Sequence, residues 1–214
     1  MDDYPALRAG MVERQLRRRG IEDERVLAAI GRVPRELFVP ARLRRRAYAD
    51  SALPIGEGQT ISQPWIVAAI CQALRLEGDE RVLEVGSGSG YSTSVLALLA
   101  REVIGIELLP VLAAGARRAI DELGLGNAEV IVGDGGLGLP DRAPFDAIAV
   151  HAAAPTEPRT LLGQLAEGGR LVAPIATGGT DVLTAFRRQG DRLDREEIGP
   201  CRFVPLLGAE GFAP

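Results

Sequence analysis

The sequence predicts an α/β fold, a doubly wound and mostly parallel sheet with extra helices before it. From residue 81 onward, short apolar runs alternate with helical patterns, which is typical of a parallel sheet with crossover helices. A glycine-rich stretch follows the first apolar run and opens a helix. The residues before 50 instead carry helical spacing without alternating strands.

Length and composition indicate a single domain. The chain has 214 residues, of which 46% are hydrophobic, and this is enough to bury one substantial core. We expect one domain over 1–214, with an N-terminal part over 1–63 and an α/β core over 64–214. The net charge of −4 provides no general attraction to nucleic acid.

The N-terminal part is predicted to be helical. One helix has apolar residues at helical spacing and ends near Gly20; these residues are Leu7, Met11, Val12 and Leu16. A second helix is expected over 23–30. Residues 53–63 are polar, contain glycine and lack a helical period, so they predict a loop or a short ribbon. Pro64 then opens another helix as a first-turn proline.

The remaining elements alternate along the chain. Strands are predicted at 81–85, 102–106, 128–132, 145–150 and 170–175, with two more near 182–187 and 202–207. Helices are predicted at 92–100, 110–123 and 157–166. Pro205 indicates that the last strand lies at an edge or ends there, because proline cannot donate to a sheet ladder.

The glycine-rich stretch indicates a nucleotide-cofactor turn. Gly86, Gly88 and Gly90 follow a strand and precede a helix, and they let the backbone approach a ligand closely. A dinucleotide fingerprint would need glycine or alanine at Tyr91. A phosphate-binding P-loop needs a lysine, and this chain contains none. The turn therefore suits a compact nucleoside without pyrophosphate, a description that S-adenosyl-L-methionine fits.

Three carboxylates lie near this turn in the predicted sheet. Glu107 ends the second strand, 21 positions after Gly86, where a carboxylate can accept both hydroxyls of a ribose. Asp134 follows the third strand and is placed to accept from an adenine amino group, although Asp-Gly pairs also favour ordinary turns. Glu84 lies within the first strand and is expected to orient the glycine loop or to face the positive end of a methionine moiety.

Other residues limit the function classes and the compartment. Cys71 and Cys201 lie far apart, so we expect packed free thiols in a reducing cytoplasm. His151 is the only histidine, which leaves no ligand set for zinc. No apolar run is long enough to span a bilayer, and the acidic start lacks a signal pattern. The arginine runs 17–19 and 44–46 are expected to be solvated helix faces; the alternative is a site for an anionic partner or a substrate carboxylate.

Segments spread over nearly the whole sequence carry a family resemblance. They are Arg-Val-Pro-Arg-Glu-Leu-Phe-Val (32–39), Leu-Pro-Ile-Gly-Glu-Gly-Gln-Thr-Ile-Ser-Gln-Pro (53–64), Val-Leu-Glu-Val-Gly-Ser-Gly-Ser-Gly-Tyr (82–91), Gly-Asp-Gly (133–135), Ala-Pro-Phe-Asp-Ala-Ile (143–148), 165–174 and 202–206. With these segments the chain resembles the protein-L-isoaspartate O-methyltransferases. The cofactor motifs occur in many methyltransferases, whereas the Thr-Ile-Ser-Gln-Pro loop is specific to this family.

The resemblance implies a Rossmann-like, S-adenosyl-L-methionine-dependent methyltransferase with one antiparallel strand and N-terminal helices over the cleft. It implies methylation of the carboxylate of isoaspartyl residues in damaged proteins, which starts their repair. The expected partners are therefore isoaspartyl peptides and proteins, without nucleic acid or membrane, and we expect a cytoplasmic monomer.

The resemblance also implies roles for individual residues. Ser62 would belong to the active site, although a serine before Pro64 could instead cap the helix. The residues expected at the cofactor are Gln59, Thr60, Ile61, Glu84, Gly86, Ser87, Gly88, Gly90, Glu107, Leu108, Gly133 and Asp134.

The chemistry of such a reaction needs few groups. A carboxylate with an ordinary pKa of ~3.9 is ionised at neutral pH, so no general base is required. His151, at the end of the fourth predicted strand, departs from the small residue or threonine that relatives often carry there. The alternative function is therefore a methyltransferase for another carboxylate or a small hydroxyl compound, with His151 as base. A non-catalytic binding module is disfavoured by the intact cofactor set.

Overall fold

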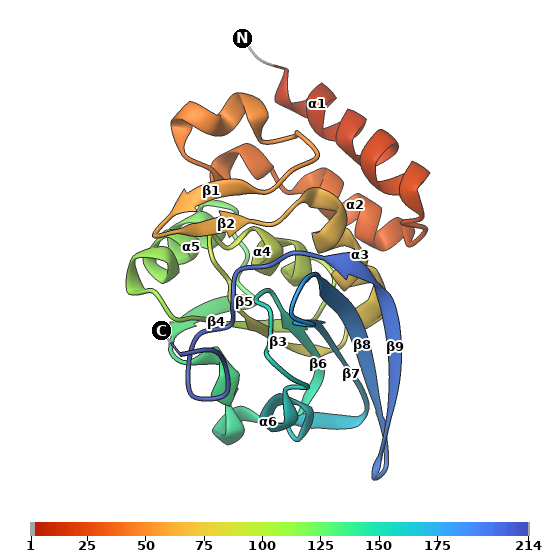
Figure 1. Ribbon diagram of the computed structural model, residues 1–214. Helices are drawn as coiled ribbons and strands as arrows, with labels where there is room; N and C mark the ends of the chain where they lie inside the picture. The colour runs from red at the N-terminus through yellow and green to blue at the C-terminus, as the bar shows by residue number, and fades with distance from the viewer. Residues whose placement is uncertain (1–2, 214) are drawn as a thin grey trace.

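A seven-stranded mixed sheet forms the centre of the molecule in the computed structural model, which describes residues 3–213 (Figure 1). Its strands follow the order β5-β4-β3-β6-β7-β8-β9. Their bounds are β3 Arg81–Val85, β4 Glu102–Glu107, β5 Ala128–Val132, β6 Phe145–Val150, β7 Leu165–Ile175, β8 Asp181–Gln189 and β9 Arg192–Cys201. Because the chain leaves β3 toward β4 on one side and returns to β6 on the other, the order of winding reverses between β3 and β6.

The direction of the strands confirms the predicted sheet. Strands β5, β4, β3, β6 and β7 pair in parallel. Strand β8 pairs antiparallel with both β7 and β9, so β8 alone runs against the other strands of the sheet. The sheet is therefore doubly wound and mostly parallel, with one antiparallel strand.

Helices cover the sheet and its carboxyl end. The helices that belong to the α/β core are α3 (Pro64–Leu74), α4 (Tyr91–Ala97), α5 (Pro110–Glu122) and α6 (Arg159–Leu162), with short turns η5 (Gly135–Leu137) and η6 (Pro140–Arg142). The N-terminal layer comprises α1 (Tyr4–Met11), η1 (Val12–Leu16), η2 (Arg17–Arg19), α2 (Glu24–Arg32), η3 (Arg35–Phe38) and η4 (Ala41–Arg46). This layer lies across one end of the sheet (Figure 1). Among the described residues, no helix has the length and apolar character to cross a membrane.

Alternating side chains of the strands divide the core into two layers. Val82 and Val103 are buried in the cluster that includes α3, α4 and the N-terminal layer. Leu83 and Ile104, one position further along the same strands, are buried in the cluster on the opposite face, with α6. Because successive side chains of a strand point to opposite faces, an all-apolar strand is buried on both sides, as a parallel sheet requires.

Local sequence signals define several helix ends. Asp23 caps α2 by accepting hydrogen bonds from the backbone nitrogens of Arg25 and Val26, at 2.9 and 3.3 Å. Gly20 adopts a left-handed conformation with φ of 88° and ends the first helical segment, as predicted. Pro64 is the first residue of α3, also as predicted.

The short ribbon that the sequence allowed over 53–63 is present. Strand β1 (Leu53–Gly56) pairs antiparallel with β2 (Gln59–Ile61). Gly58 in the connecting turn has a φ of 70°, a conformation that favours glycine. The ribbon lies between the N-terminal layer and the carboxyl ends of the sheet strands (Figure 1).

Two predicted elements were wrong. Residues 202–207 are not a strand: the last strand is β9, which forms a tight hairpin with β8 around Gly190, and the chain after Cys201 is irregular. The apolar residues of that stretch are used to cover the sheet end instead of joining the ladder. The helix expected over 157–166 is limited to α6, because Gly163 ends it and Leu165 already pairs with Phe145 in the sheet.

Candidate active site

The glycine loop connects β3 to α4 at the carboxyl edge of the sheet. Gly86, Gly88 and Gly90 have φ values of 83°, 54° and 86°, which residues with a Cβ rarely adopt. A Cβ on Gly90 would lie 2.9 Å from the Cβ of Ala116 in α5, so this glycine also allows α4 and α5 to pack closely. The loop therefore needs glycine for its backbone conformation, and Gly90 needs it for helix packing as well.

Glu107 links this loop to the end of β4. Its buried carboxylate accepts hydrogen bonds from the backbone nitrogens of Gly88 and Leu109, at 2.8 and 2.9 Å. The same side chain contributes to the wall of the neighbouring pocket. A carboxylate that is fixed by two backbone amides and faces a pocket is suited to accept hydrogen bonds from the hydroxyl groups of a ligand.

A buried carboxylate and imidazole lie beneath the loop. Glu84 is fully buried and accepts hydrogen bonds from the hydroxyls of Ser92 and Thr93 at the start of α4. Its Oε1 lies 3.4 Å from Nε2 of His151, the residue that follows β6. Burial lowers the pKa of His151 below its ordinary value, and the opposing effect of Glu84 is smaller, so the imidazole is neutral near pH 7.

The larger of two adjoining hollows has a volume of about 200 Å³ and lies across the ends of β3, β4 and β6. Six of the residues expected at the cofactor line it: Gln59, Thr60, Gly86, Gly88, Glu107 and Leu108. It lies at the switch point of the sheet, where α/β folds bind their ligands. An acceptor carboxylate, a close-approaching glycine loop and apolar walls fit a compact nucleoside such as that of S-adenosyl-L-methionine.

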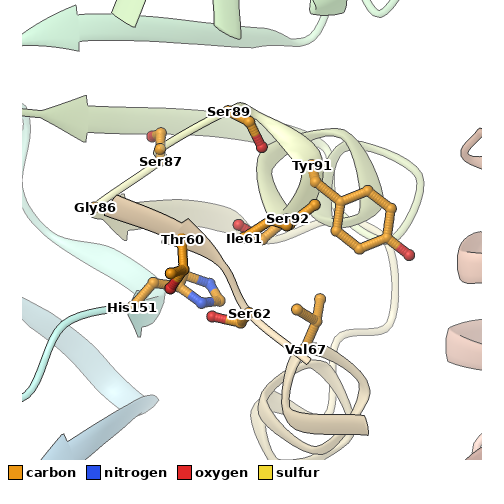
Figure 2. Close-up of a pocket in the computed structure, with 11 residues that line it drawn as sticks. Thr60, Ile61, Ser62, Val67, Gly86, Ser87, Ser89, Tyr91, Ser92 and His151 are labelled. Carbon is orange, nitrogen blue, oxygen red and sulfur yellow. The ribbon is translucent and has the colours of Figure 1, made fainter. Parts of the chain in front are cut away.

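The smaller hollow, with a volume of about 30 Å³, lies between the ribbon and the glycine loop (Figure 2). Ser62 lines it together with Thr60 and Ile61, and Ser87 lines it from the loop side. His151 lines both hollows, so its side chain lies where they meet. The polar groups at this wall are hydroxyls and one neutral imidazole, which can donate to an anion without neutralising it.

Ser62 does not cap α3. The residue at the cap position is Gln63, and no side chain there bonds to the helix. Ser62 is half-buried, and its backbone oxygen accepts a hydrogen bond from Arg35 at 2.7 Å. The alternative role considered for this serine is therefore wrong, and its side chain belongs to the wall of the smaller hollow.

Four of the expected residues do not line either hollow. Glu84 lies beneath the loop, and Gly90 packs against α5. Gly133 donates from its backbone nitrogen to the carbonyl of Glu107, at 3.1 Å. Asp134 accepts from the nitrogens of Gly136 and Ala209, at 2.9 and 2.7 Å. In this structure the Asp134 carboxylate therefore holds the C-terminal segment, while its neighbour Gly135 reaches the larger hollow.

Sequence reasoning missed the C-terminal wall of the larger hollow. Residues 202–213, called the C-terminal segment below, cross the strand ends, and Val204 to Leu207 line the hollow. Backbone hydrogen bonds at 2.8 Å join Ala153 to Val204 and to Leu206. These residues are apolar and carry no motif for a ligand; the resemblance at 202–206 was the one available signal.

The arginine runs differ in their surroundings. Arg17, Arg18 and Arg19 form ion pairs with Glu24, Glu13 and Asp50 respectively, and these side chains are largely exposed. Residues 44–46 are exposed on η4. Exposed ion pairs of this kind contribute little to stability because solvent screens them, which agrees with the prediction of solvated faces.

Comparisons with known proteins agree with this geometry. The family model "Protein-L-isoaspartate(D-aspartate) O-methyltransferase (PCMT)" matches residues 8–211. A protein-L-isoaspartate O-methyltransferase 2 of Marinobacter nauticus is 53% identical over 212 residues, covering 98% of this chain and 97% of that protein.

Two solved structures are similar along nearly the whole chain. One, named protein-L-isoaspartate O-methyltransferase, has a TM-score of 0.83 at 28% identity, covering 95% of this chain and 66% of the other. The second, from Plasmodium falciparum and described as a protein-L-isoaspartate O-methyltransferase in complex with S-adenosyl-L-homocysteine, has a TM-score of 0.81 at 27% identity, covering 94% of this chain and 98% of the other.

Proposed function

Because this chain belongs to the protein-L-isoaspartate(D-aspartate) O-methyltransferase family, we propose that the two adjoining hollows are the two halves of its active site. The enzyme transfers a methyl group from S-adenosyl-L-methionine to the carboxylate of isoaspartyl residues in damaged proteins. In our proposal the larger hollow takes the nucleoside, and the smaller hollow takes the acceptor carboxylate. The observation that carries this proposal is that Thr60, Gly86, Gly88 and His151 line both hollows, so the two adjoin.

We assign the binding roles by position. Glu107 would accept the ribose hydroxyls, and Gly86 and Gly88 would allow the methionine part to pass close to the backbone. Gln59, Thr60 and Leu108 would close the larger hollow from the ribbon and from the end of β4. Glu84 would not contact the ligand; it would fix the start of α4 by accepting hydrogen bonds from Ser92 and Thr93.

Methyl transfer requires that the carboxylate is aligned with the methyl group and shielded from water. When bound, S-adenosyl-L-methionine supplies a methyl group activated by its positive sulfur. The acceptor carboxylate is ionised before it arrives, with an ordinary pKa of ~3.9, so no residue has to remove a proton. Ser62 and Thr60 would orient the carboxylate with their hydroxyls, while Ile61 and Val67 exclude water beside it. Removing water from the carboxylate and holding it in line lower the barrier.

A paired peptide assay tests the proposal. The enzyme is incubated with labelled S-adenosyl-L-methionine and either an isoaspartyl peptide or the same peptide with an ordinary aspartyl residue. We expect methyl incorporation into the isoaspartyl peptide alone. Equal incorporation, or none, would contradict the proposed function.

The role of His151 in the reaction distinguishes the proposed function from the alternative, a methyltransferase for a hydroxyl compound. A neutral imidazole at the smaller hollow could serve as a base for a hydroxyl acceptor, but a carboxylate acceptor does not need one. We expect a pH–rate profile for the isoaspartyl peptide that is flat near neutrality. A rate that rises with pH and loses that dependence in His151→Ala would support the hydroxyl-directed alternative.

Assembly and compartment are proposed from the pockets and the cysteines. We propose that the enzyme acts as a monomer, since both hollows are built from one chain. Cys71 and Cys201 are buried free thiols, which agrees with the proposed cytoplasmic location.

A further inference from the structure

Arg35 is completely buried, with 0% of its surface exposed, yet it carries a charge. Its Nε donates to the carbonyl oxygen of Ala47 at 2.8 Å, and its Nη2 donates to that of Ser62 at 2.7 Å. Its guanidinium also stacks on the ring of Tyr91, 4.8 Å from the ring centre. Burial lowers the pKa of Arg35, but the ordinary value for arginine is so high that the group remains protonated.

Arg35 contacts one residue on each of two walls of the smaller hollow, Ser62 and Tyr91. Ser62 belongs to the loop between β2 and α3, and Tyr91 is the first residue of α4, directly after the glycine loop. Both residues line the hollow, from different sides (Figure 2). One side chain from the N-terminal layer therefore contacts both the loop that carries Ser62 and the residue that follows the glycine loop.

Stability alone gives no reason for a cation at this place. Among the described residues no carboxylate pairs with Arg35, and its Nη1 has no hydrogen-bond partner. Burying a charge without a counter-ion is costly, and an apolar side chain of similar volume would avoid that cost. What an apolar side chain would lose is the planar fork, which fixes two carbonyl oxygens and an aromatic face in one geometry.

We propose that Arg35 is a positioning residue for methyl transfer. It holds the backbone of Ser62 at a set distance from the end of the glycine loop, so that the acceptor carboxylate lies in line with the methyl donor. This inference rests on the proposed function of the two hollows. It assigns Arg35 no contact with substrate or cofactor, because Arg35 lines neither hollow.

Three variants test the proposal. Arg35→Met removes the fork and keeps much of the volume, and Arg35→Lys keeps the charge without the fork. Arg8→Met is the matched control: Arg8 lies in the same N-terminal layer and bonds to Tyr48 and Glu36, but not to either wall of the hollow. Each variant is compared in kcat and KM for the isoaspartyl peptide, and in Kd for S-adenosyl-L-homocysteine by calorimetry.

We expect Arg35→Met to lower kcat by roughly 10- to 100-fold, since misplacement by about 1 Å can cost a factor of that size. The Kd for S-adenosyl-L-homocysteine should change less than about twofold, because the larger hollow is intact. Arg35→Lys should recover part of kcat, and it also serves if Arg35→Met does not fold. Arg8→Met should retain the kcat of the parent enzyme.

Hydrogen exchange gives a readout that does not depend on turnover. Amides of residues 57–63 should exchange faster in Arg35→Met and Arg35→Lys than in the parent or in Arg8→Met, because the loop has lost its tether. An unchanged kcat in folded Arg35→Met, full recovery by lysine, or an equal loss in Arg8→Met would overturn the inference. Failure of the parent enzyme in the paired peptide assay would instead overturn the proposed function.

Discussion

The carboxylate of Glu107 performs a structural task before any ligand arrives, because it accepts from the amides of Gly88 and Leu109. We predict that Glu107→Ala weakens binding of S-adenosyl-L-homocysteine by roughly 10-fold or more, since a hydrogen bond to a charged group contributes ~1.5–3 kcal/mol. Calorimetry measures this directly, with Glu107→Gln as the control of equal size. Normal binding by Glu107→Ala would show that the ribose assignment is wrong.

Ser62 is expected to act on the acceptor and not on the donor. Its side chain lines the smaller hollow, and it is not among the residues of the larger one. We predict that Ser62→Ala lowers kcat for the isoaspartyl peptide about tenfold, in line with the loss of one hydrogen bond of ~1.4 kcal/mol. The Kd for S-adenosyl-L-homocysteine should stay within about twofold of the parent value. A larger effect on that Kd than on kcat would place Ser62 at the donor.

The buried His151 predicts a dependence of stability on pH. Its pKa is lowered in the folded state by burial, so between that lowered value and the ordinary 6.5 the unfolded chain binds a proton that the folded chain does not. The contribution of this group to folding is therefore complete above 6.5 and decreases as the pH falls through that window, with a slope of up to ~1.4 kcal/mol per pH unit.

We predict that His151→Gln, which cannot titrate, removes this component. Urea unfolding of both proteins at several pH values below and above neutrality measures it. The free energy of unfolding of the variant should improve relative to the parent as the pH falls below the ordinary value of histidine. Parallel curves would contradict a depressed pKa at His151.

Among the elements, the C-terminal segment 202–213 is held in place by two carboxylates. Asp134 holds it at Ala209, and Asp181 holds its start by accepting from the nitrogen of Phe203 at 2.9 Å. In both tethers a side-chain carboxylate accepts a hydrogen bond from a backbone amide of the segment. The segment thereby forms a wall of the larger hollow without belonging to a strand.

We predict that Asp134→Ala and Asp181→Ala both speed hydrogen exchange in this segment, because each removes a tether. Binding of S-adenosyl-L-homocysteine should weaken by about tenfold or more in Asp134→Ala if that carboxylate also accepts from adenine, and by less in Asp181→Ala. Equal weakening in the two variants would restrict Asp134 to its tethering role. Calorimetry on both variants distinguishes these outcomes.

For the whole molecule, the burial of the N-terminal layer supports the prediction of one domain. Leu16 in η1 is fully buried in the cluster that also contains residues of α3 and α4 and Val82 of β3. We predict that Leu16→Ala lowers the free energy of unfolding by about 2–5 kcal/mol. Its Tm should fall by roughly 4–20 °C, at about 2–4 °C per kcal/mol for a chain of this size.

Calorimetry should record a single transition for Leu16→Ala, because the N-terminal layer and the sheet share one core. Leu7→Ala is the control, since Leu7 lies on α1 with 40% of its surface exposed and should change stability by less than about 0.5 kcal/mol. Two separate transitions would show that residues 1–63 unfold on their own, and the chain would then have two units.

The elements that depend on neighbours in sequence were predicted well. Strands β3 to β6, the opening of α3 at Pro64 and the left-handed Gly20 all follow from apolar runs, proline and glycine, whose effects are local. The glycine loop and Glu107 were likewise expected, because a βα turn and the end of the next parallel strand meet at one sheet edge.

Residues whose role depends on distant contacts were missed or misread. For Ser62 the sequence left two roles open, the active site and a helix cap; the structure rules out the cap, since Gln63 takes the cap position and Arg35 binds the carbonyl of Ser62 across 27 positions. The segment after Cys201 was taken for a strand because its apolar residues fit either a ladder or a wall. The sequence alone thus determined strands β3 to β6, the glycine loop and the family. The tertiary structure decided which side chains share a hollow, since desolvation and long-range packing leave no local pattern.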